Sequence, residues 1–300
     1  MVAKKSKVNQ IAIVTAVVLI VYAILMFIPI AWTLMTTLKF PDEYGFMENV
    51  LGFPKKGFTL TNYVTAYENF LIRVQMFDSD GIPFFKEFYI MDQFGNSILY
   101  SVGCGLTTTL ASLVMGYASA RFKYKFSGII YSFVIVTIAL PIVGALPSEI
   151  AVSNGLGIFD TFPGIWIMRA TFLNTYFLIF YAQFKSIPYD YTEAAKIDGA
   201  NPFAIMVKII VPLAMNTAIA IFVLNFIAYW NDYQIPMVYL PSHPVAAYGM
   251  YKFEYDPIEA TNNIPTKMAG TFLMALPIIV FYAVFNSKLN VNMSVGGIKG

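Results

Sequence analysis

Few residues of this 300-residue chain belong to the types that carry out chemistry. One cysteine, Cys104, and one histidine, His243, cannot supply the four ligands of a structural zinc site. The sequence also has no Gly-x-x-x-x-Gly-Lys-Ser/Thr phosphate loop and no cluster of a nucleophile with an acid–base pair. We therefore predict that the chain is not an enzyme, and that it has no catalytic residue, no metal site and no cofactor of its own.

The composition predicts a protein that lies within a lipid bilayer. Hydrophobic residues make up 58% of the chain and charged residues only 12%, whereas a soluble domain carries about 25% charged residues. The formal net charge of +2 provides no basic surface for a polyanion, which excludes a nucleic-acid-binding protein.

Six stretches are long and apolar enough to cross a membrane as helices. A helix rises about 1.5 Å per residue, so about 20 apolar residues cross about 30 Å of hydrocarbon. The first stretch follows three lysines but is too long for the apolar part of a secretory signal, and we interpret it as a retained span. The predicted fold is an all-α membrane protein with spans at 11–36, 96–119, 128–150, 161–184, 210–230 and 268–286.

The distribution of basic residues predicts that both termini lie in the cytoplasm. In that orientation the cytoplasmic segments hold 11 basic and three acidic residues, and the outer segments hold seven basic and 13 acidic residues. Cytoplasmic loops carry such an excess of Lys and Arg. The chain then consists of a cytoplasmic N-terminus (1–10), a membrane domain (11–286) and a cytoplasmic tail (287–300). Two outer segments, 37–95 and 231–267, are long, and we expect a short amphipathic helix near 60–73 in the first.

Residues 185–212 form the most informative polar segment on the cytoplasmic side. Pro188 suits the first turn of a helix, and Gly199 can adopt the positive φ that ends one. Asn201-Pro202 prevents simple continuation and allows a second helix to begin, which runs into the fifth span. A short helix in this position can dock into a groove of a partner protein, or it can lie on the inner face of the membrane.

The same segment resembles the cytoplasmic signature of the permease subunits of bacterial ATP-binding-cassette (ABC) importers. That signature reads Glu-Ala-Ala, three residues, Gly, nine residues and Ile-x-Leu-Pro. At the same spacing this chain has Glu193-Ala194-Ala195, Gly199 and Ile209-Ile210-Val211-Pro212, with Val211 in place of the preferred leucine. Asp198-Gly199-Ala200 is similar to the carbohydrate-importer form of the signature.

The resemblance extends over nearly the whole chain. Residues 58–63, the pair Asn96-Ser97, residues 117–122 and the pair Trp230-Asn231 are similar to family phrases at the corresponding places. The tail 295–300 resembles the ending of the maltose-type second permease subunit. Residues 74–92 are the exception, because they look like extra outer sequence.

The resemblance implies a type I ABC importer permease fold in the bacterial inner (cytoplasmic) membrane, with a short coupling helix in a coupling loop at 185–209. That helix would sit in a cleft of a separate ATPase subunit, and closure of two ATPases, which bind ATP and Mg, would switch the spans between inward-facing and outward-facing states. The cargo would be a sugar or oligosaccharide. The expected partners are a second homologous permease subunit in a heterodimer, two ATPase subunits, an extracellular sugar-binding protein and membrane lipid, with no nucleic acid. The residues expected to couple to the ATPase are Glu193, Ala194, Ala195, Asp198, Gly199, Ile209 and Pro212.

Polar residues within or beside the spans are candidates for the path of the transported solute. Arg169 lies inside the fourth span, where burying a charged side chain at the centre of the membrane costs about 2.5–3.5 kcal/mol. Its guanidinium is therefore expected either to face a cavity or a partner, or to extend to the outer interface. Asn225, Tyr229, Trp230 and Asn231 combine aromatic faces with hydrogen-bonding groups, which suits either a sugar or an interfacial aromatic belt.

Two other classes of protein fit the sequence less well. An ion-coupled secondary transporter for a small polar solute is expected to have acidic or histidine residues within its spans and repeated halves, neither of which is visible. The acidic residue Glu149 lies near the outer end of the third span and is expected to be at the surface, so it is not counted as an interior charge. A lipid-modifying membrane enzyme would need a clustered catalytic set.

Overall fold

The computed structural model describes residues 2–45, 49–122, 127–140, 144–255 and 261–290. The chain divides into two compact units, one made of residues 1–71 and 252–275 and the other of residues 72–251 and 276–300. The candidate residues at 169–231 all belong to the second unit.

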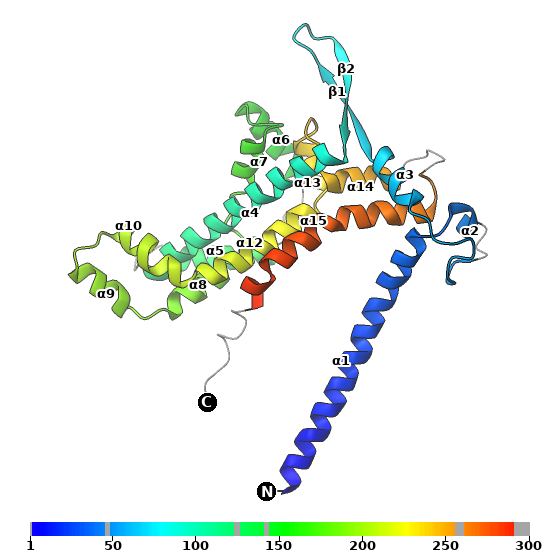
Figure 1. The fold of residues 1–300 in the computed structure, drawn as a ribbon. Coiled ribbons are helices and arrows are strands. Elements are labelled where there is room, and N and C mark those ends of the chain that lie inside the picture. The colour runs from blue at the N-terminus through cyan, green and yellow to red at the C-terminus, as the bar shows by residue number, and fades with distance from the viewer. Residues whose placement is uncertain (1, 46–48, 123–126, 141–143, 256–260, 291–300) are drawn as a thin grey trace. The chain divides into compact units, whose positions relative to one another are not determined.

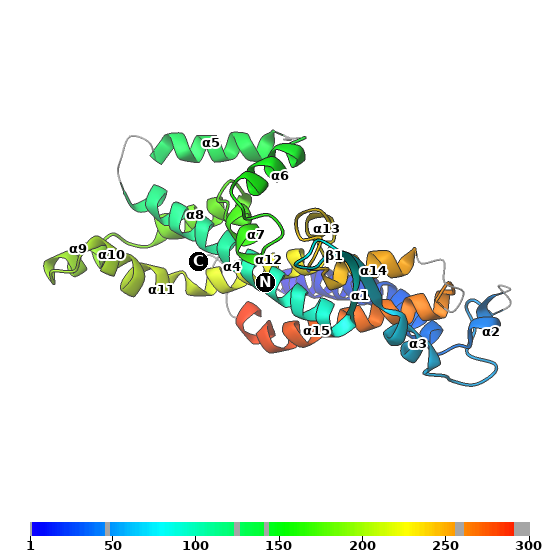
Figure 2. The same ribbon diagram turned by 90° about the horizontal axis from the view of Figure 1, so that it is seen from above.

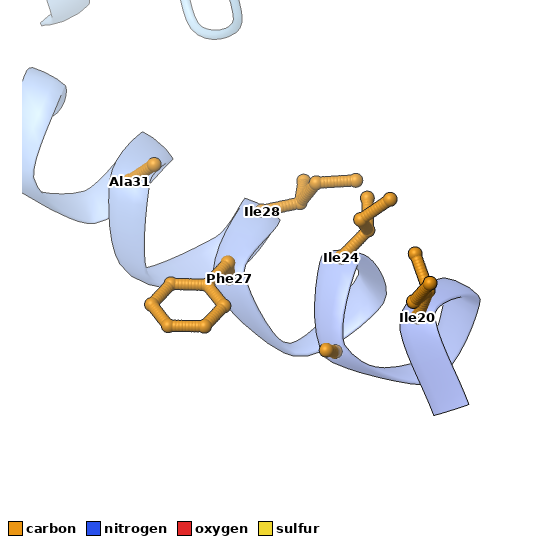
Figure 3. A pocket seen from close by; sticks show the side chains of 6 residues that line it. Ile20, Ile24, Phe27, Ile28 and Ala31 are labelled. Atoms are coloured by element: carbon orange, nitrogen blue, oxygen red, sulfur yellow. The ribbon is translucent and has the colours of Figure 1, made fainter. Parts of the chain in front are cut away.

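The first unit begins with a single long helix, α1 (Val2–Thr37), which is continuous through Pro29. Every large apolar side chain of α1 between Ile11 and Ile30 is at least half exposed. Figure 3 shows one stripe of this surface, to which Ile20, Ile24, Phe27, Ile28 and Ala31 contribute. Such a surface is typical of a helix that meets lipid or another chain within a membrane.

The rest of the first unit connects the end of α1 to the later part of the chain. It comprises α2 (Pro41–Gly45), α3 (Thr61–Asn69), the end of α14 (Ala246–Glu254) and the first part of α15 (Ile264–Asn290). The buried Asn62 in α3 donates to the carbonyl of Thr37 (2.8 Å), and its Oδ1 lies 3.2 Å from the hydroxyl of Thr266 in α15. One amide therefore joins three helices.

The central helix of the second unit is α4 (Ile90–Arg121), and α8 (Thr175–Ser186) and α12 (Met215–Trp230) pack along it (Figures 1 and 2). Glycines allow this close packing. A Cβ on Gly116 would lie only 2.7 Å from the Cβ of Phe180 in α8, and a Cβ on Gly105 would lie 3.3 Å from the ring of Phe222 in α12. This three-helix contact supplies the frame on which the candidate site residues are held.

A two-stranded hairpin, β1 (Leu71–Phe77) and β2 (Pro83–Tyr89), precedes α4 (Figure 1). It corresponds largely to the extra segment 74–92, and it is an exception to the predicted all-α fold. Asp78 Oδ1 accepts from the backbone N–H groups of Asp80 and Ile82 and so closes the turn. The expected helix near 60–73 is shorter than predicted, because α3 ends at Asn69 and the chain then enters β1.

Within the described residues, three helices are long and apolar enough to cross a membrane: Gln10–Thr37, Ile90–Arg121 and Ile264–Val284. The fifth predicted span is part of a bent pair, Pro202–Leu213 and Met215–Trp230, with an angle of 74° between the two helices. If the two helices of this pair together form a single span, the described residues contain four candidate spans.

Two predicted spans are not single continuous helices. The stretch 128–150 holds α5 (Ser127–Ala139) and the start of α6 (Leu146–Gly155), and the stretch 161–184 holds α7 (Phe162–Arg169) and most of α8. Six spans and two cytoplasmic termini remain predictions. The tail 291–300 and Lys123 to Phe126 lie outside the described residues.

Candidate functional site

The segment 185–212 folds as the predicted short helix, turn and second helix. α9 (Asp190–Ile197) is followed by Gly199 with a φ of +79°, a conformation that favours glycine, and then by α10 (Pro202–Ile205). Asn201 Oδ1 accepts from the N–H of Ala204 at 2.8 Å and caps α10. The local helix-ending and helix-capping residues therefore account for the shape of the segment 185–212.

The two alanines of the motif lie on different sides of α9. Ala195 is buried in an apolar cluster with residues of α4, α8 and α12, whereas Ala194 and Glu193 are exposed. The exposed side of α9 also carries Asp198 and Ile197, whose side chain is 86% exposed. Of the two alanines, Ala194 is therefore the one available for close packing against another chain, and Ala195 fixes α9 to its own unit.

The end of the motif forms an irregular connection between α10 and α12. Residues Met206–Ile210 form a π-helical turn, η1, and the N–H of Val211 donates to the carbonyl of Met206. Because Pro212 has no N–H to donate and its ring crowds the preceding turn, a wider turn accommodates it. Ile209 packs against the same apolar cluster as Ala195, while Pro212 is exposed just before the bend at Ala214.

Arg169 lies deep along α4 rather than near one end of it. The hydroxyl of Thr108 donates to the Arg169 carbonyl at 2.8 Å, and Thr108 is about 27 Å along α4 from Ile90 at about 1.5 Å per residue. Arg169 is the last residue of α7, and the chain runs without helix through 170–174 before α8 begins. If α4 crosses the membrane, the break between α7 and α8 falls near its middle.

The guanidinium of Arg169 is paired with an acidic and an aromatic side chain. Its Nη2 lies 3.3 Å from Oε2 of Glu149, and the Tyr239 hydroxyl donates to the same oxygen at 2.6 Å. The guanidinium also lies over the Tyr239 ring, 5.4 Å from its centroid. Burial and this hydrogen bond raise the pKa of Tyr239 to about 12, so its hydroxyl remains a donor at neutral pH. Glu149, expected at the surface, has a side chain that is 42% exposed and is also the ion-pair partner of Arg169.

Two candidates on α12 reach the same part of α4. The Tyr229 hydroxyl lies 2.9 Å from the Thr108 hydroxyl, and the buried Asn225 donates to the hydroxyl of Thr109 at 3.1 Å. Asn225, Tyr229 and Arg169 thus converge on two adjacent threonines.

The other two candidates lie apart from this convergence. Trp230 is 3% exposed and packs between the rings of Phe94 and Phe226, with centroid distances of 6.1 and 5.9 Å. Asn231 is exposed, and its side chain donates to the Ile227 carbonyl of its own helix at 2.8 Å. Both side chains are held by neighbours in α4 and α12.

The α8 end of the break adds polar groups beside the two threonines. Asn174 Oδ1 caps α8 by accepting from the N–H of Phe177 at 3.2 Å, and the Ser112 hydroxyl of α4 donates to the same oxygen at 3.1 Å. The region from Thr108 to Ser112 is thus the polar centre of the second unit. We call Thr108, Thr109, Arg169, Asn225 and Tyr229 the threonine cluster.

A mostly helical membrane protein with a polar centre between its helices and an exposed helix between α8 and α12 has the features of a transport subunit. The chain belongs to the family described as binding-protein-dependent transport system inner membrane component, whose family model matches residues 108–291. That range contains the whole motif 193–212 and all five substrate-path candidates.

Similar proteins agree with this membership. The chain is 31% identical over 224 residues to the trehalose transport system permease protein SugB of Mycobacterium tuberculosis, which covers 70% of this chain and 78% of SugB. It is 22% identical over 299 residues to the diacetylchitobiose uptake system permease protein NgcG of Streptomyces coelicolor, covering 96% and 89% of the two chains. The predicted family and the predicted location in the inner membrane are confirmed.

A solved structure shows the same fold. A chain of a bacterial ABC transporter involved in the import of the acidic polysaccharide alginate superposes with a TM-score of 0.72 at 21% identity, covering 93% of this chain and 96% of that one. The chain is thus an inner-membrane permease subunit of an ABC importer, and the relatives named here are transport subunits and not enzymes.

Sequence reasoning missed two residues of the site, Glu149 and Tyr239. The signal that identifies Glu149 is the cost of an unpaired arginine in a span, since Glu149 is the nearest acidic residue to Arg169 among the predicted spans. Tyr239 has no such signal, because it is one of 20 tyrosines in the chain.

Proposed function

We propose that this chain carries a sugar or oligosaccharide across the inner membrane as one half of the permease of an ABC importer. The observation that carries the proposal is the exposed face of α9, which lies between α8 and α12 in the chain, presents Glu193 and Ala194 of the family signature and is followed by the exposed Gly199. Relatives named for trehalose and diacetylchitobiose transport support the carbohydrate class.

In this proposal α9 is the coupling helix. Glu193 and Asp198 offer charged contacts to a separate ATPase subunit, and Ala194 permits close approach of its surface. Gly199, with its positive φ, sets the angle between α9 and α10, and Ile209 and Pro212 shape the connection to α12. Ala195 acts from inside by fixing α9 to the apolar cluster.

The rest of the importer would consist of other chains. A second homologous permease forms a heterodimer with this one, two ATPase subunits bind ATP and Mg, and an extracellular binding protein delivers the sugar. The absence of a phosphate loop from the sequence supports placing ATP hydrolysis on the separate subunits. The predicted orientation, with six spans and cytoplasmic termini, would put α9 on the same side as the ATPases.

The threonine cluster is the proposed contribution of this chain to the substrate path. It brings hydroxyl, amide and phenol groups together beside a break between two half-helices, a feature that transporters use to form solute sites within the membrane. Glu149 and Tyr239 join the proposed set because they hold the guanidinium of Arg169. Trp230 and Asn231 are proposed to support the path from its edge.

The test of coupling uses Glu193→Lys and Gly199→Pro in the transporter assembled with its partner subunits. Proteoliposomes are supplied with labelled trehalose or maltotriose on the binding-protein side and ATP on the other. We expect both variants to insert into the membrane but to lose uptake, while Glu68→Lys, the same change of charge on the exposed face of α3, retains it. Normal uptake by both motif variants would refute the coupling role.

A further inference from the structure

The C-terminal end of α4 is fastened to the segment that joins α8 to α9, by contacts that lie outside the family signature. Arg121 is the last residue of α4 and is 8% exposed. Its Nη1 donates to the carbonyl of Ile187 at 2.9 Å, and its Nη2 donates to the carbonyl of Pro188 at 3.3 Å. The guanidinium therefore holds two successive peptide groups just before α9.

Tyr189, in turn, binds the backbone at the end of α4. Its hydroxyl donates to the Arg121 carbonyl at 2.7 Å, and the guanidinium of Arg121 lies 4.7 Å from the centroid of its ring. Tyr189 directly precedes Asp190, the first residue of α9. The Arg121 side chain thus binds the backbone just before Tyr189, and the Tyr189 side chain binds the backbone of Arg121. The Tyr189 ring and the Arg121 guanidinium also contact each other.

A buried apolar cluster also connects α9 with α4 and α8. Ala195 of α9 and Tyr117 of α4 belong to the same buried cluster, in which the Tyr117 ring meets the Phe184 ring edge-on at 5.5 Å. In Figure 1, α9 lies at one end of the second unit, beyond α8. At that position, the contacts with α4 determine whether α9 moves alone or together with α4 and α8. A short helix held by both polar and apolar contacts moves with the helix that holds it.

We infer that Arg121 and Tyr189 are a positioning pair that makes α9 and α4 move as one body, so that displacement of α9 by the ATPase reaches the threonine cluster through α4. The inference rests on the proposed role of α9 as the coupling helix. From Arg121 to Thr108 the path is about 20 Å of continuous helix, at about 1.5 Å per residue. The same helix thus carries the two threonines at one point and holds the entry to α9 at its end.

Loss of the pair should let α9 shift without α4. Arg121→Gln removes both guanidinium hydrogen bonds and the ring contact, whereas Tyr189→Phe removes one hydrogen bond and keeps the stacked ring. We expect Arg121→Gln to raise the ATP hydrolysed per sugar imported about tenfold and Tyr189→Phe about threefold, since each hydrogen bond contributes a net factor of about 2–10. The control is Lys185→Gln, an exposed residue on the predicted cytoplasmic side that donates to the Tyr181 hydroxyl (3.3 Å) and has no hydrogen bond with Arg121 or Tyr189 among the described residues.

A spectroscopic experiment on the full chain in lipid nanodiscs tests the link without the ATPase. Spin labels are placed at Val114→Cys on α4 and Lys196→Cys on α9, two exposed positions, while the native Cys104 is buried. We expect a narrow distribution of label distances in the parent and in Lys185→Gln, a broad one in Arg121→Gln and an intermediate one in Tyr189→Phe. An unchanged distribution in Arg121→Gln would overturn the inference.

The outcomes separate this inference from the proposed function. If Glu193→Lys abolishes uptake while Arg121→Gln and Tyr189→Phe keep the parent ratio of ATP to sugar, α9 is the coupling helix but the pair does not transmit its motion. If Arg121→Gln does not insert or fold, Tyr189→Phe decides, and parent values for both its distance distribution and its ATP ratio would overturn the inference.

Discussion

The ion pair between Arg169 and Glu149 shows how a single charged side chain is accommodated in an apolar chain. The guanidinium shares one carboxylate oxygen with the Tyr239 hydroxyl and also lies over the Tyr239 ring. Its Nε is buried without a hydrogen-bond partner among the described residues. The acid and the phenol therefore carry most of the stabilisation of this charge.

Removal of the acid should destabilise the chain. We expect Glu149→Gln to lower the free energy of unfolding by about 1–2 kcal/mol, because a half-buried guanidinium then loses its charged partner. The double variant with Arg169→Gln should lose less than the sum of the two single variants. Thermal unfolding in detergent measures this, with Glu68→Gln on an exposed face as the control. Strictly additive losses would show that the pair contributes nothing.

A second residue-scale prediction concerns Glu87 in the hairpin. Hydrogen bonds from Tyr89 and Arg73 hold the pKa of its carboxyl below the usual 4.5. The hairpin contacts are thus present above pH 4.5 and are lost as the pH falls through the lowered pKa, when the folded carboxylate takes up its proton. Hydrogen exchange of β1 and β2 should accelerate in that acid range in the parent and show no such step in Glu87→Gln. An identical acid step in both chains would contradict the assignment.

At the scale of elements, the packing of α4 against α8 depends on one glycine. A Cβ on Gly116 would meet Phe180 at 2.7 Å, whereas a Cβ on Gly95 of the same helix would meet nothing within 4 Å. We expect Gly116→Ala to destabilise the chain by about 1–3 kcal/mol, and Gly95→Ala to be neutral or stabilising by up to about 1 kcal/mol. Unfolding midpoints of the two variants check this. Equal shifts in both would mean that the two helices are not in close contact there.

The elements that local sequence signals define were predictable. Pro188, Gly199 and Asn201-Pro202 are local signals for helix ends, and α9 and α10 follow them. The hairpin was not predictable, because strands depend on pairing between 71–77 and 83–89, and only its Asp-Ser-Asp-Gly turn is visible locally.

The helix breaks were not predictable for a related reason. Within residues 170–174 only Thr171 and Asn174 interrupt the apolar run, and the break is supported by Ser112 and Thr108, which are distant in sequence. For the same reason, the sequence indicated Arg169, Asn225 and Tyr229 as polar residues but not that they meet at two threonines.

At the scale of the whole molecule, several features indicate that the chain works within a larger assembly. α1 exposes apolar side chains along most of its length, and α9 exposes Ile197 beside acidic residues. The family is defined by dependence on a binding protein, and the sequence carries no phosphate loop. These features agree with the proposed function, in which other chains deliver the sugar and hydrolyse ATP and this chain contributes to the passage.

The most direct test is sugar uptake into proteoliposomes that contain either the assembled transporter or this chain alone. We predict uptake of labelled trehalose or maltotriose only with the second permease, both ATPases, the loaded binding protein and ATP present together, and none with this chain alone under an ion gradient. Uptake by the chain alone, driven by an ion gradient without ATP, would contradict the account and identify an ion-coupled carrier.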